Sequence, residues 1–280
     1  MNIGFISGKG GTGKTYLSVN LAARVKGSLY LDCDCEEPNG HLFFRPSIDK
    51  RHIVNVCGVS IDSNRCDGCH QCVDFCVYNA LAMARNKAMV FPDLCHGCGG
   101  CIRICPMGAI EEKPQSIGVI MQGHHDDHGV ISGFLDPGKE SAVMIIRHLF
   151  SLARTWGDGY CFVDCPPGNG CQVMECVHHS DYVVIVAEPS IFGLSNLKMT
   201  VRLTESMDKR AAVIINKSMG DDDLIVDYCR EHHLPLVGTM PFDRTLAHMN
   251  NEAKIAVDES IEYAQVFDDI WARLKSEIER

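Results

Sequence analysis

The 280-residue sequence has no long apolar run, and its basic residues are outnumbered by its acidic ones. Without a stretch of about 18 apolar residues, no membrane-spanning helix is expected. The opening MNIGFISGKGG lacks the charged and then apolar layout of a secretory signal peptide. The 26 Lys and Arg against 36 Asp and Glu give a net charge of -10, which argues against a nucleic-acid partner because phosphate contacts need clustered cations. We therefore expect a cytoplasmic protein that neither inserts into a membrane nor binds nucleic acid.

The lack of a signal peptide also bears on the 16 cysteines. In a chain of this length, metal binding is a better interpretation than a disulfide framework. Eight of the cysteines fall in two tight runs. The other eight are scattered, and most of them are expected to be small buried apolar residues. The scattered ones are Cys33, Cys35, Cys57, Cys161, Cys165, Cys171, Cys176 and Cys229.

Short apolar runs alternate with amphipathic segments over most of the chain. This pattern predicts an α/β fold with a doubly wound, mainly parallel sheet and helices on both of its faces. Strands are expected at residues 2–7, 28–32, 53–62, 160–164, 182–187, 211–216 and 234–242, and helices at 14–25, 139–155, 192–207, 221–232 and 260–279. Both cysteine runs interrupt this pattern. We therefore expect one α/β domain made of residues 1–58 and 115–280, with a small domain of residues 59–114 inserted into it.

The motif GKGGTGKT directly follows the first expected strand and directly precedes the first expected helix. It fits the P-loop pattern G-x-x-x-x-G-K-[ST], in which backbone N–H groups and a helix N-terminus surround phosphate oxygens. Lys14 is expected to reach the β- and γ-phosphates, and the Thr15 hydroxyl to bind Mg²⁺. The residues expected around the phosphates are Gly8, Lys9, Gly10, Gly11, Thr12, Gly13, Lys14 and Thr15.

A second lysine, Lys9, stands at the start of this loop, so that KGGTGKT resembles the deviant Walker A signature of the MinD/ParA/nitrogenase-iron-protein class. In that class the first lysine crosses a dimer interface to the partner's nucleotide. The stretches LDCD (31–34) and FVDCPPG (162–168) match the switch I and switch II segments of the class. The resemblance implies that Asp164 holds Mg²⁺ through water, and that Asp34 or Asp32 orients or activates the attacking water. It also implies a homodimer or a heterodimer with a paralogue.

Two later stretches, IINK (214–217) and PFD (241–243), match the segments that hold the base in this class. They imply base contacts from Asn216, Pro241 and Asp243. The base is expected to be adenine, because a guanine reader of the usual kind needs N-K-x-D, and Met219 occupies the fourth position here. The resemblance thus predicts binding and slow hydrolysis of Mg-ATP.

The two cysteine runs share the spacing C-x2-C-x2-C-x3-C, which is that of bacterial ferredoxins. In this motif the fourth cysteine of each run ligates the cluster of the other run. We therefore predict two [4Fe-4S] clusters, the first bound by Cys66, Cys69, Cys72 and Cys105 and the second by Cys76, Cys95, Cys98 and Cys101. Zinc in two four-cysteine sites is the alternative, although zinc has no use for the third cysteine of each run.

A P-loop ATPase with a ferredoxin inserted after switch I resembles the MinD-superfamily ATPases that contain such an insert, and the resemblance covers the whole chain. It implies a nucleotide-dependent dimer switch coupled to electron transfer to a redox partner protein. A carrier or assembly ATPase that hands over metal or clusters is the alternative, although the C-x-x-C that such carriers usually have near the end of the ATPase domain is missing. A spatial organiser of the MinD or ParA kind is disfavoured by the acidic character of the last expected helix.

Three further features stay open at this point. Cys171 lies seven residues after Asp164, the offset of a cluster ligand in the nitrogenase iron protein. With Cys176 it is a candidate for a third metal or cluster site, and the alternative is a thiol packed near switch II. The loop at 123–129 either binds a metal or is simply solvated; its imidazoles are His124, His125 and His128. The apolar stripe of the last helix is expected to pack on the sheet.

Overall fold

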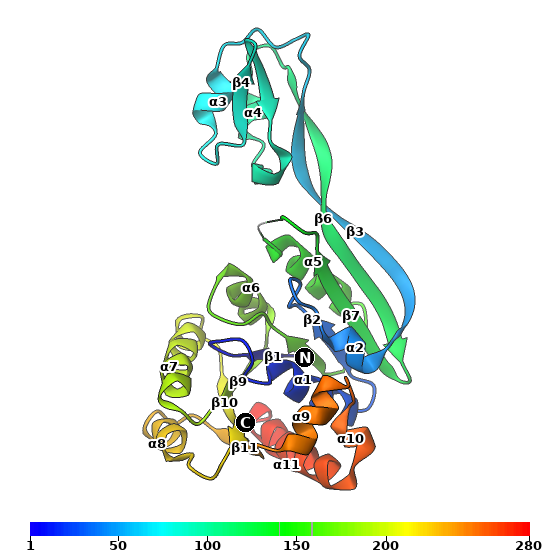
Figure 1. The fold of residues 1–280 in the computed structure, drawn as a ribbon, viewed down its shortest axis with the longest axis vertical. Coiled ribbons are helices and arrows are strands. Elements are labelled where there is room, and N and C mark those ends of the chain that lie inside the picture. The colour runs from blue at the N-terminus through cyan, green and yellow to red at the C-terminus, as the bar shows by residue number, and fades with distance from the viewer. Residues whose placement is uncertain (140, 158) are drawn as a thin grey trace.

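The protein, described by a computed structural model over residues 1–139, 141–157 and 159–280, consists of a large body and a small head joined by an arm (Figure 1). The body strands are β1 (Asn2–Ile6), β2 (Leu29–Asp32), β3 (Ser47–Ile61), β6 (Ile110–His125), β7 (His128–Leu135), β8 (Cys161–Asp164), β9 (Tyr182–Ala187), β10 (Ala211–Ser218) and β11 (Leu236–Pro241). The body helices are α1 (Lys14–Arg24), α2 (Gly40–Phe44), α5 (Val143–Ala153), α6 (Cys171–His179), α7 (Ile191–Ser206), α8 (Asp223–Glu231), α9 (Arg244–Asn251), α10 (Ala256–Glu259) and α11 (Ile261–Ile278). The head contains α3 (Gln71–Phe75), β4 (Leu81–Ala84), β5 (Lys87–Val90), the 3₁₀ turn η1 (Pro92–Leu94) and α4 (Gly100–Ile104).

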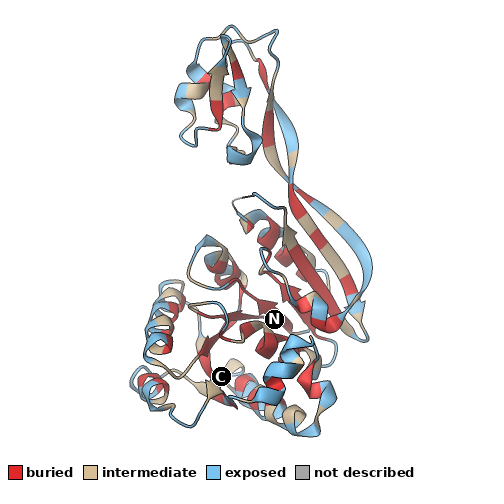
Figure 2. Ribbon diagram, viewed as in Figure 1, coloured by how far each residue is buried: buried red, intermediate tan, exposed pale blue. Residues whose placement is uncertain are grey.

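One nine-stranded sheet forms the centre of the body, in the order β11-β10-β9-β1-β8-β2-β7-β6-β3. The strands from β11 to β7 are parallel, whereas β6 and β3 run antiparallel at the edge. Parallel strands need crossovers that place helices on the faces of the sheet, so the central strands are buried on both sides. Every residue of β9, YVVIVA, is buried (Figure 2). The expected doubly wound, mainly parallel sheet is thereby confirmed.

Helices cover both faces of this sheet. On one face α5, α6 and α7 pack on an apolar core that includes Ile145 and Val177. On the other face lie α1 and α11, and Phe267, Ile270 and Leu274 of α11 are buried there. The prediction that the last helix packs on the sheet is confirmed. No helix within the described residues is long and apolar enough to cross a membrane.

The edge of the sheet differs from the sequence-based expectation. Residues 123–129 do not form an extended loop, because β6 continues to His125 and β7 begins at His128, with a tight turn between them. Glycines weaken the strand signal of both segments, and glycine inside a strand often marks a close approach of another backbone. Gly118 is such a case, since a Cβ there would lie 2.1 Å from the carbonyl oxygen of Phe134.

The arm is a two-stranded extension of the sheet edge. β3 and β6 pair with each other along their whole length, but β6 pairs with β7 only from Gly118 onward. Residues 55–61 and 110–117 therefore leave the sheet as a twisted ribbon that carries the head (Figure 1). The expected borders of the inserted domain, after residues 58 and 114, fall within this ribbon. The head is thus connected to the body by strands that are continuous with the central sheet.

Candidate functional site

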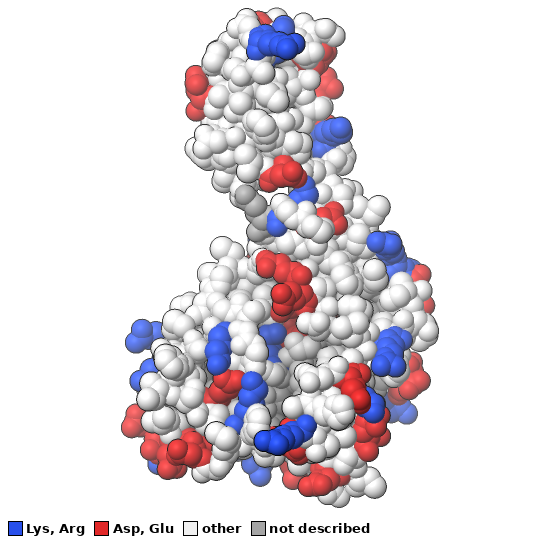
Figure 3. All heavy atoms as spheres, in the orientation of Figure 1, with Lys and Arg blue, Asp and Glu red and all other residues white. Residues whose placement is uncertain are grey.

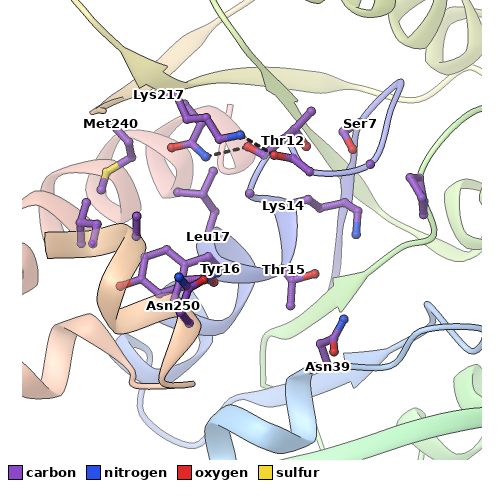
Figure 4. A pocket seen from close by; sticks show the side chains of 18 of the residues that line it. Ser7, Thr12, Lys14, Thr15, Tyr16, Leu17, Asn39, Lys217, Met240 and Asn250 are labelled. Atoms are coloured by element: carbon purple, nitrogen blue, oxygen red, sulfur yellow. Dashed lines mark hydrogen bonds between the residues drawn. The ribbon is translucent and has the colours of Figure 1, made fainter. Parts of the chain in front are cut away.

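The P-loop connects β1 to α1 and lines a cleft of about 570 Å³ at the carboxyl ends of the parallel strands (Figure 4). Gly13, the residue before α1, has a φ of 86° and has no side chain to cap the helix. A Cβ at this position would also lie only 2.1 Å from the Asn216 amide nitrogen. The N–H groups of the first turn of α1 are left without a side-chain cap. Such a helix start favours the binding of an anionic phosphate group.

A buried ion pair lies at the base of the loop. Lys14 Nζ is 2.7 Å from Asp164 Oδ1, and the two side chains are only 6% and 1% exposed. The other carboxylate oxygen, Oδ2, accepts a hydrogen bond of 3.1 Å from the Tyr30 hydroxyl. Burial alone would lower the pKa of Lys14, but the Asp164 carboxylate raises it above its ordinary value. The lysine therefore stays charged next to the phosphate-binding loop.

The two acidic candidates of switch I occupy different positions. Asp32, at the end of β2, is fully buried beneath the cleft, and its Oδ2 accepts a hydrogen bond of 2.9 Å from the Gly40 N–H. Burial and the neighbouring Asp164 carboxylate raise the pKa of Asp32 well above its usual range. Asp34 lines the cleft, and burial raises its pKa to about 6 although Lys14 opposes the shift. Of the two acids, Asp34 is therefore the one placed to meet a ligand.

The raised pKa of Asp34 predicts how the stability of an Asp34→Asn variant depends on pH. Because the folded pKa of about 6 lies above the unfolded value of about 4, the folded chain holds this proton more tightly. The contribution of Asp34 to stability therefore falls as the pH rises from about 4 to about 6. Relative to wild type, Asp34→Asn should gain about 1–2 kcal/mol between pH 4.5 and pH 7, an amount reduced by partial exposure of the carboxylate. Nucleotide-free thermal melts measure this, and an equal gap at both pH values would contradict it.

Lys9 contacts an acid that the sequence analysis did not single out. Its ammonium pairs with the carboxylate of Glu188, which also lies 2.7 Å from Lys217 Nζ. Burial would raise the pKa of Glu188, but the two lysines outweigh it and hold this pKa below its usual range. Glu188 directly follows β9, and the rule that ligands bind at the carboxyl ends of parallel strands could have indicated it.

The expected base-binding segments also line the cleft, and the first of them contacts the P-loop. Asn216 Nδ2 donates to the carbonyl oxygen of Thr12 at 2.6 Å, and Lys217 Nζ donates to that of Gly11 at 2.5 Å (Figure 4). Pro241 and Asp243 also line the cleft. Asp243 uses its carboxylate to accept from the Thr245 N–H at 2.6 Å and from the Tyr263 hydroxyl at 2.6 Å. Its side chain thus caps α9 and holds this wall of the cleft in place.

Most of the predicted nucleotide residues line this cleft. The exceptions are Gly8, Asp32 and Asp164, of which Asp32 and Asp164 are buried. No motif indicated several other residues of the lining, which come from α1, α2, β11 and α9. These are Tyr16, Asn39, Leu42, Phe43, Met240, Leu246 and Asn250.

In the head, the two cysteine runs fold as matching halves. Each run leads into a one-turn helix, α3 or α4, that follows a residue in the left-handed conformation, His70 with a φ of 67° and Gly99 with a φ of 68°. The two helices pack against each other. Cys72 and Cys101, the third cysteine of each run, are buried in one small apolar cluster. The internal duplication of the sequence is therefore also a duplication in space.

The eight cysteines surround two separate hollows, in sets that we call the first and second quartets. The first hollow is lined by Cys66, Cys69, Cys72 and Cys105. The second is lined by Cys76, Cys95, Cys98 and Cys101. Each hollow thus combines three cysteines of one run with the fourth cysteine of the other.

Each quartet brings four thiol groups to the lining of one hollow. Among the described residues, no three His, Cys, Asp or Glu side chains converge on a point that could hold one metal ion. Backbone N–H groups also reach two of the thiols, from Ala88 to Cys66 Sγ at 3.4 Å and from Ala109 to Cys105 Sγ at 3.3 Å. Such donors stabilise thiolate ligands around a cluster.

The Cys171 and Cys176 candidates are not brought together. Cys171 is exposed at the start of α6, whereas Cys176 is buried within the same helix. The Cys176 thiol interacts with those of Cys33 and Cys165, and burial raises its pKa well above the usual range. These three thiols are all buried, which matches the expectation that most of the scattered cysteines are small core residues.

The three histidines near the β6–β7 turn have separate partners. His124 Nδ1 lies 3.0 Å from Asp49 Oδ2, and His128 Nδ1 lies 3.1 Å from Ser28 Oγ. His125 Nε2 is 3.9 Å from Asp126 Oδ2. Within the described part of the chain, these imidazoles form no group that could hold a metal ion.

Comparisons with known proteins agree with this geometry. The CobQ/CobB/MinD/ParA nucleotide binding domain matches residues 3–256. An uncharacterized protein of Methanocaldococcus jannaschii, MJ0578, is 26% identical over 280 residues, which cover 98% of this chain and 96% of MJ0578. An uncharacterized ferredoxin of the same organism, MJ0199, is 37% identical over 60 residues, covering 20% of this chain and 97% of the ferredoxin.

Among solved structures, the MinD cell division protein of Aquifex aeolicus superposes with a TM-score of 0.58 at 19% identity. The alignment covers 98% of this chain and 97% of MinD, which shows a shared fold. Because the family match extends over most of the sequence and includes the P-loop, the chain belongs to the CobQ/CobB/MinD/ParA family of nucleotide-binding P-loop ATPases.

Proposed function

We propose that this protein binds and hydrolyses Mg-ATP, and that a nucleotide-dependent dimer switch in the body is coupled to two [4Fe-4S] clusters in the head for ATP-gated electron transfer to a redox partner. One observation carries the coupling. β2 ends at Asp32 in the nucleotide site and pairs with β7, β7 pairs with β6, and β6 pairs with β3. Since β6 and β3 continue as the arm, a movement at the end of β2 acts on strands that reach the head.

In the cleft, different residues bind the phosphates, hold Mg²⁺ and orient the attacking water. The N–H groups of the P-loop and the Lys14 ammonium bind the phosphates, and Thr15 and Asp164 would hold Mg²⁺. Asp34 orients the attacking water, whose oxygen forms the new bond to the γ-phosphorus as the bridge to the β-phosphate breaks. Its pKa of about 6 leaves Asp34 mostly ionised at neutral pH, and therefore able to accept a hydrogen bond from that water.

A second copy of the chain, or a paralogue, would complete the switch. Lys9 is still 42% exposed beside the cleft. Ile191 and Phe192, three and four residues after Glu188, are 76% and 80% exposed. Large exposed apolar side chains next to a nucleotide site favour an interface there. Dimerisation would bury them and bring Lys9 close to the partner's nucleotide.

In the head, each quartet would hold one [4Fe-4S] cluster, which supplies reversible one-electron chemistry. The match to a ferredoxin over 60 residues supports this assignment, with residues 59–114 as the inserted ferredoxin domain of an ATPase made of residues 1–58 and 115–280. Burial of Cys72 and Cys101 within an apolar shell favours a retained centre. The alternative, a carrier that gives up metal or clusters, requires that shell to open.

Anaerobically prepared protein tests the proposal against this alternative. With ATP and Mg²⁺, sedimentation should show a dimer that is absent with ADP, and EPR-monitored titration should show a shifted midpoint potential at unchanged iron content. ATP-dependent transfer of iron to an apo-ferredoxin would support the carrier instead. If ATP changes neither the mass, the potential nor the iron content, the coupling is wrong.

A further inference from the structure

The two quartets are alike in sequence but differ in their surroundings. We infer that the first quartet holds the more easily reduced of the two clusters, and that Lys139 of the body raises the reduction potential at the second. This inference rests on the proposed binding of two clusters in the head. It names residues of this chain that would set the two potentials independently of each other.

Hydrogen bonds and a positive charge gather at the first quartet. Two N–H groups point at its sulfurs, that of Ala88 at Cys66 and that of Ala109 at Cys105. The Lys87 ammonium, half-buried, donates to the carbonyl oxygen of Cys66. A cluster gains a negative charge on reduction, so nearby donors and cations stabilise its reduced form.

A negative charge lies close to the second quartet. Asp93 lies two residues before Cys95 and lines the same hollow as Cys95. A carboxylate beside a cluster opposes the addition of an electron. Since Asp67 likewise lines the hollow of the first quartet, the carboxylates do not separate the two sites. The N–H donors and Lys87 at the first quartet therefore make the second site the harder one to reduce.

Lys139 brings a compensating charge to this side of the head. It lies between β7 and α5, and with Cys95 and His96 it lines a hollow of about 180 Å³ where the head meets the body. Its Nζ is 2.7 Å from Asp93 Oδ1, and its side chain is only 16% exposed. Figure 3 shows positively and negatively charged side chains close together where the head meets the body. Of the described residues that line the hollow, Lys139 is the one Lys or Arg.

Lys139 belongs to the body and not to the head, so a movement of the body can change the charge near the second quartet. Asp93 and Cys95 line this same hollow, so without Lys139 the Asp93 carboxylate would be left uncompensated beside the second quartet. Gln115 of the arm also holds this segment, since its Nε2 donates to the carbonyl oxygen of Pro92 at 3.0 Å. Lys139 follows β7, which is paired to β2 of the nucleotide site. The second site is therefore the one whose potential the body can change.

An anaerobic redox titration followed by EPR tests this in wild type, Lys87→Gln and Lys139→Gln, with Lys50→Gln as the control. Lys50 lies on β3 at its body end, away from both quartets. We expect two midpoints in wild type. Lys87→Gln should move only the more positive one to a lower potential, and Lys139→Gln only the more negative one. Adding Asp93→Asn to Lys139→Gln should move that second midpoint back.

The inference is overturned if Lys139→Gln leaves both midpoints in place, or if Lys87→Gln lowers the more negative one. Iron analysis separates this outcome from a failure of the proposed function. About eight irons per chain in every variant, four for each cluster, means that the clusters are present and that only the assignment of potentials is wrong. A wild-type chain without cluster signals contradicts the proposed function itself.

Discussion

Replacing Lys14 with methionine is expected to abolish ATP hydrolysis and to destabilise the fold, and a second substitution separates these two effects. Lys14 and Asp164 form a nearly fully buried ion pair. Removing one partner leaves an uncompensated buried charge, which costs about 3–5 kcal/mol. The loss of a positive charge aimed at the phosphates should lower the hydrolysis rate about 100-fold or more.

The double variant Lys14→Met/Asp164→Asn removes the uncompensated charge as well. An asparagine oxygen still accepts the hydrogen bond that the Tyr30 hydroxyl now gives to Asp164 Oδ2. We therefore expect most of the lost stability to return while hydrolysis stays absent. Urea unfolding and phosphate release measure the two properties. A double variant that hydrolyses ATP, or a single variant as stable as wild type, would show that the pair has another role.

Alanine substitutions in the head should remove iron in a pattern set by the quartets and not by the order of the cysteines in the chain. Cys76→Ala and Cys95→Ala lie in different runs but line the same hollow. Each is expected to reduce the iron content from about eight to about four per chain, since a [4Fe-4S] cluster needs all four thiolates. Because both changes remove the same cluster, the double variant should also keep about four.

The matched comparison pairs two cysteines of one run. Cys66→Ala/Cys76→Ala removes a ligand from each hollow, so this variant should lose nearly all of its iron. Cys229→Ala is the control, because this thiol is buried in α8, away from the head. Iron analysis and EPR of anaerobic samples give the counts. If the same-run double variant keeps about four irons, each run binds its own cluster and the crossed assignment is wrong.

The central body was predictable because its strands are buried on both faces. Apolar runs such as YVVIVA appear as strands wherever they pack between two helix layers, and the P-loop fixed the position of the first helix. The sequence analysis predicted only the second part of β3. The first residues of this strand, SIDKRH, are mostly exposed at the sheet edge and show no apolar alternation. β6 contains Pro114, which normally argues against a strand but is tolerated at an edge.

The nucleotide site shows a similar limit. Its motif residues were found because their chemistry requires fixed spacing. The different burial of Asp32 and Asp34 depends on Gly40, whose N–H binds Asp32 from eight residues away. Glu188 and the aromatic lining of the cleft carry no spacing signal, since they meet the P-loop only through the order of the strands. Lys139 likewise reaches Asp93 only because the arm bends the head back over the loop after β7.

One consequence of the arm concerns how the chain enters and leaves the head. Gly58 and Lys113 are direct partners across the two strands, although 55 positions separate them in sequence. An insertion whose two ends emerge as neighbours imposes no new path on the surrounding chain, which is why domains are readily gained at such places. A short hairpin turn could close the same two strands. The head is therefore a module that an ancestral nucleotide-binding protein could acquire, exchange or lose without redesigning the rest of the molecule.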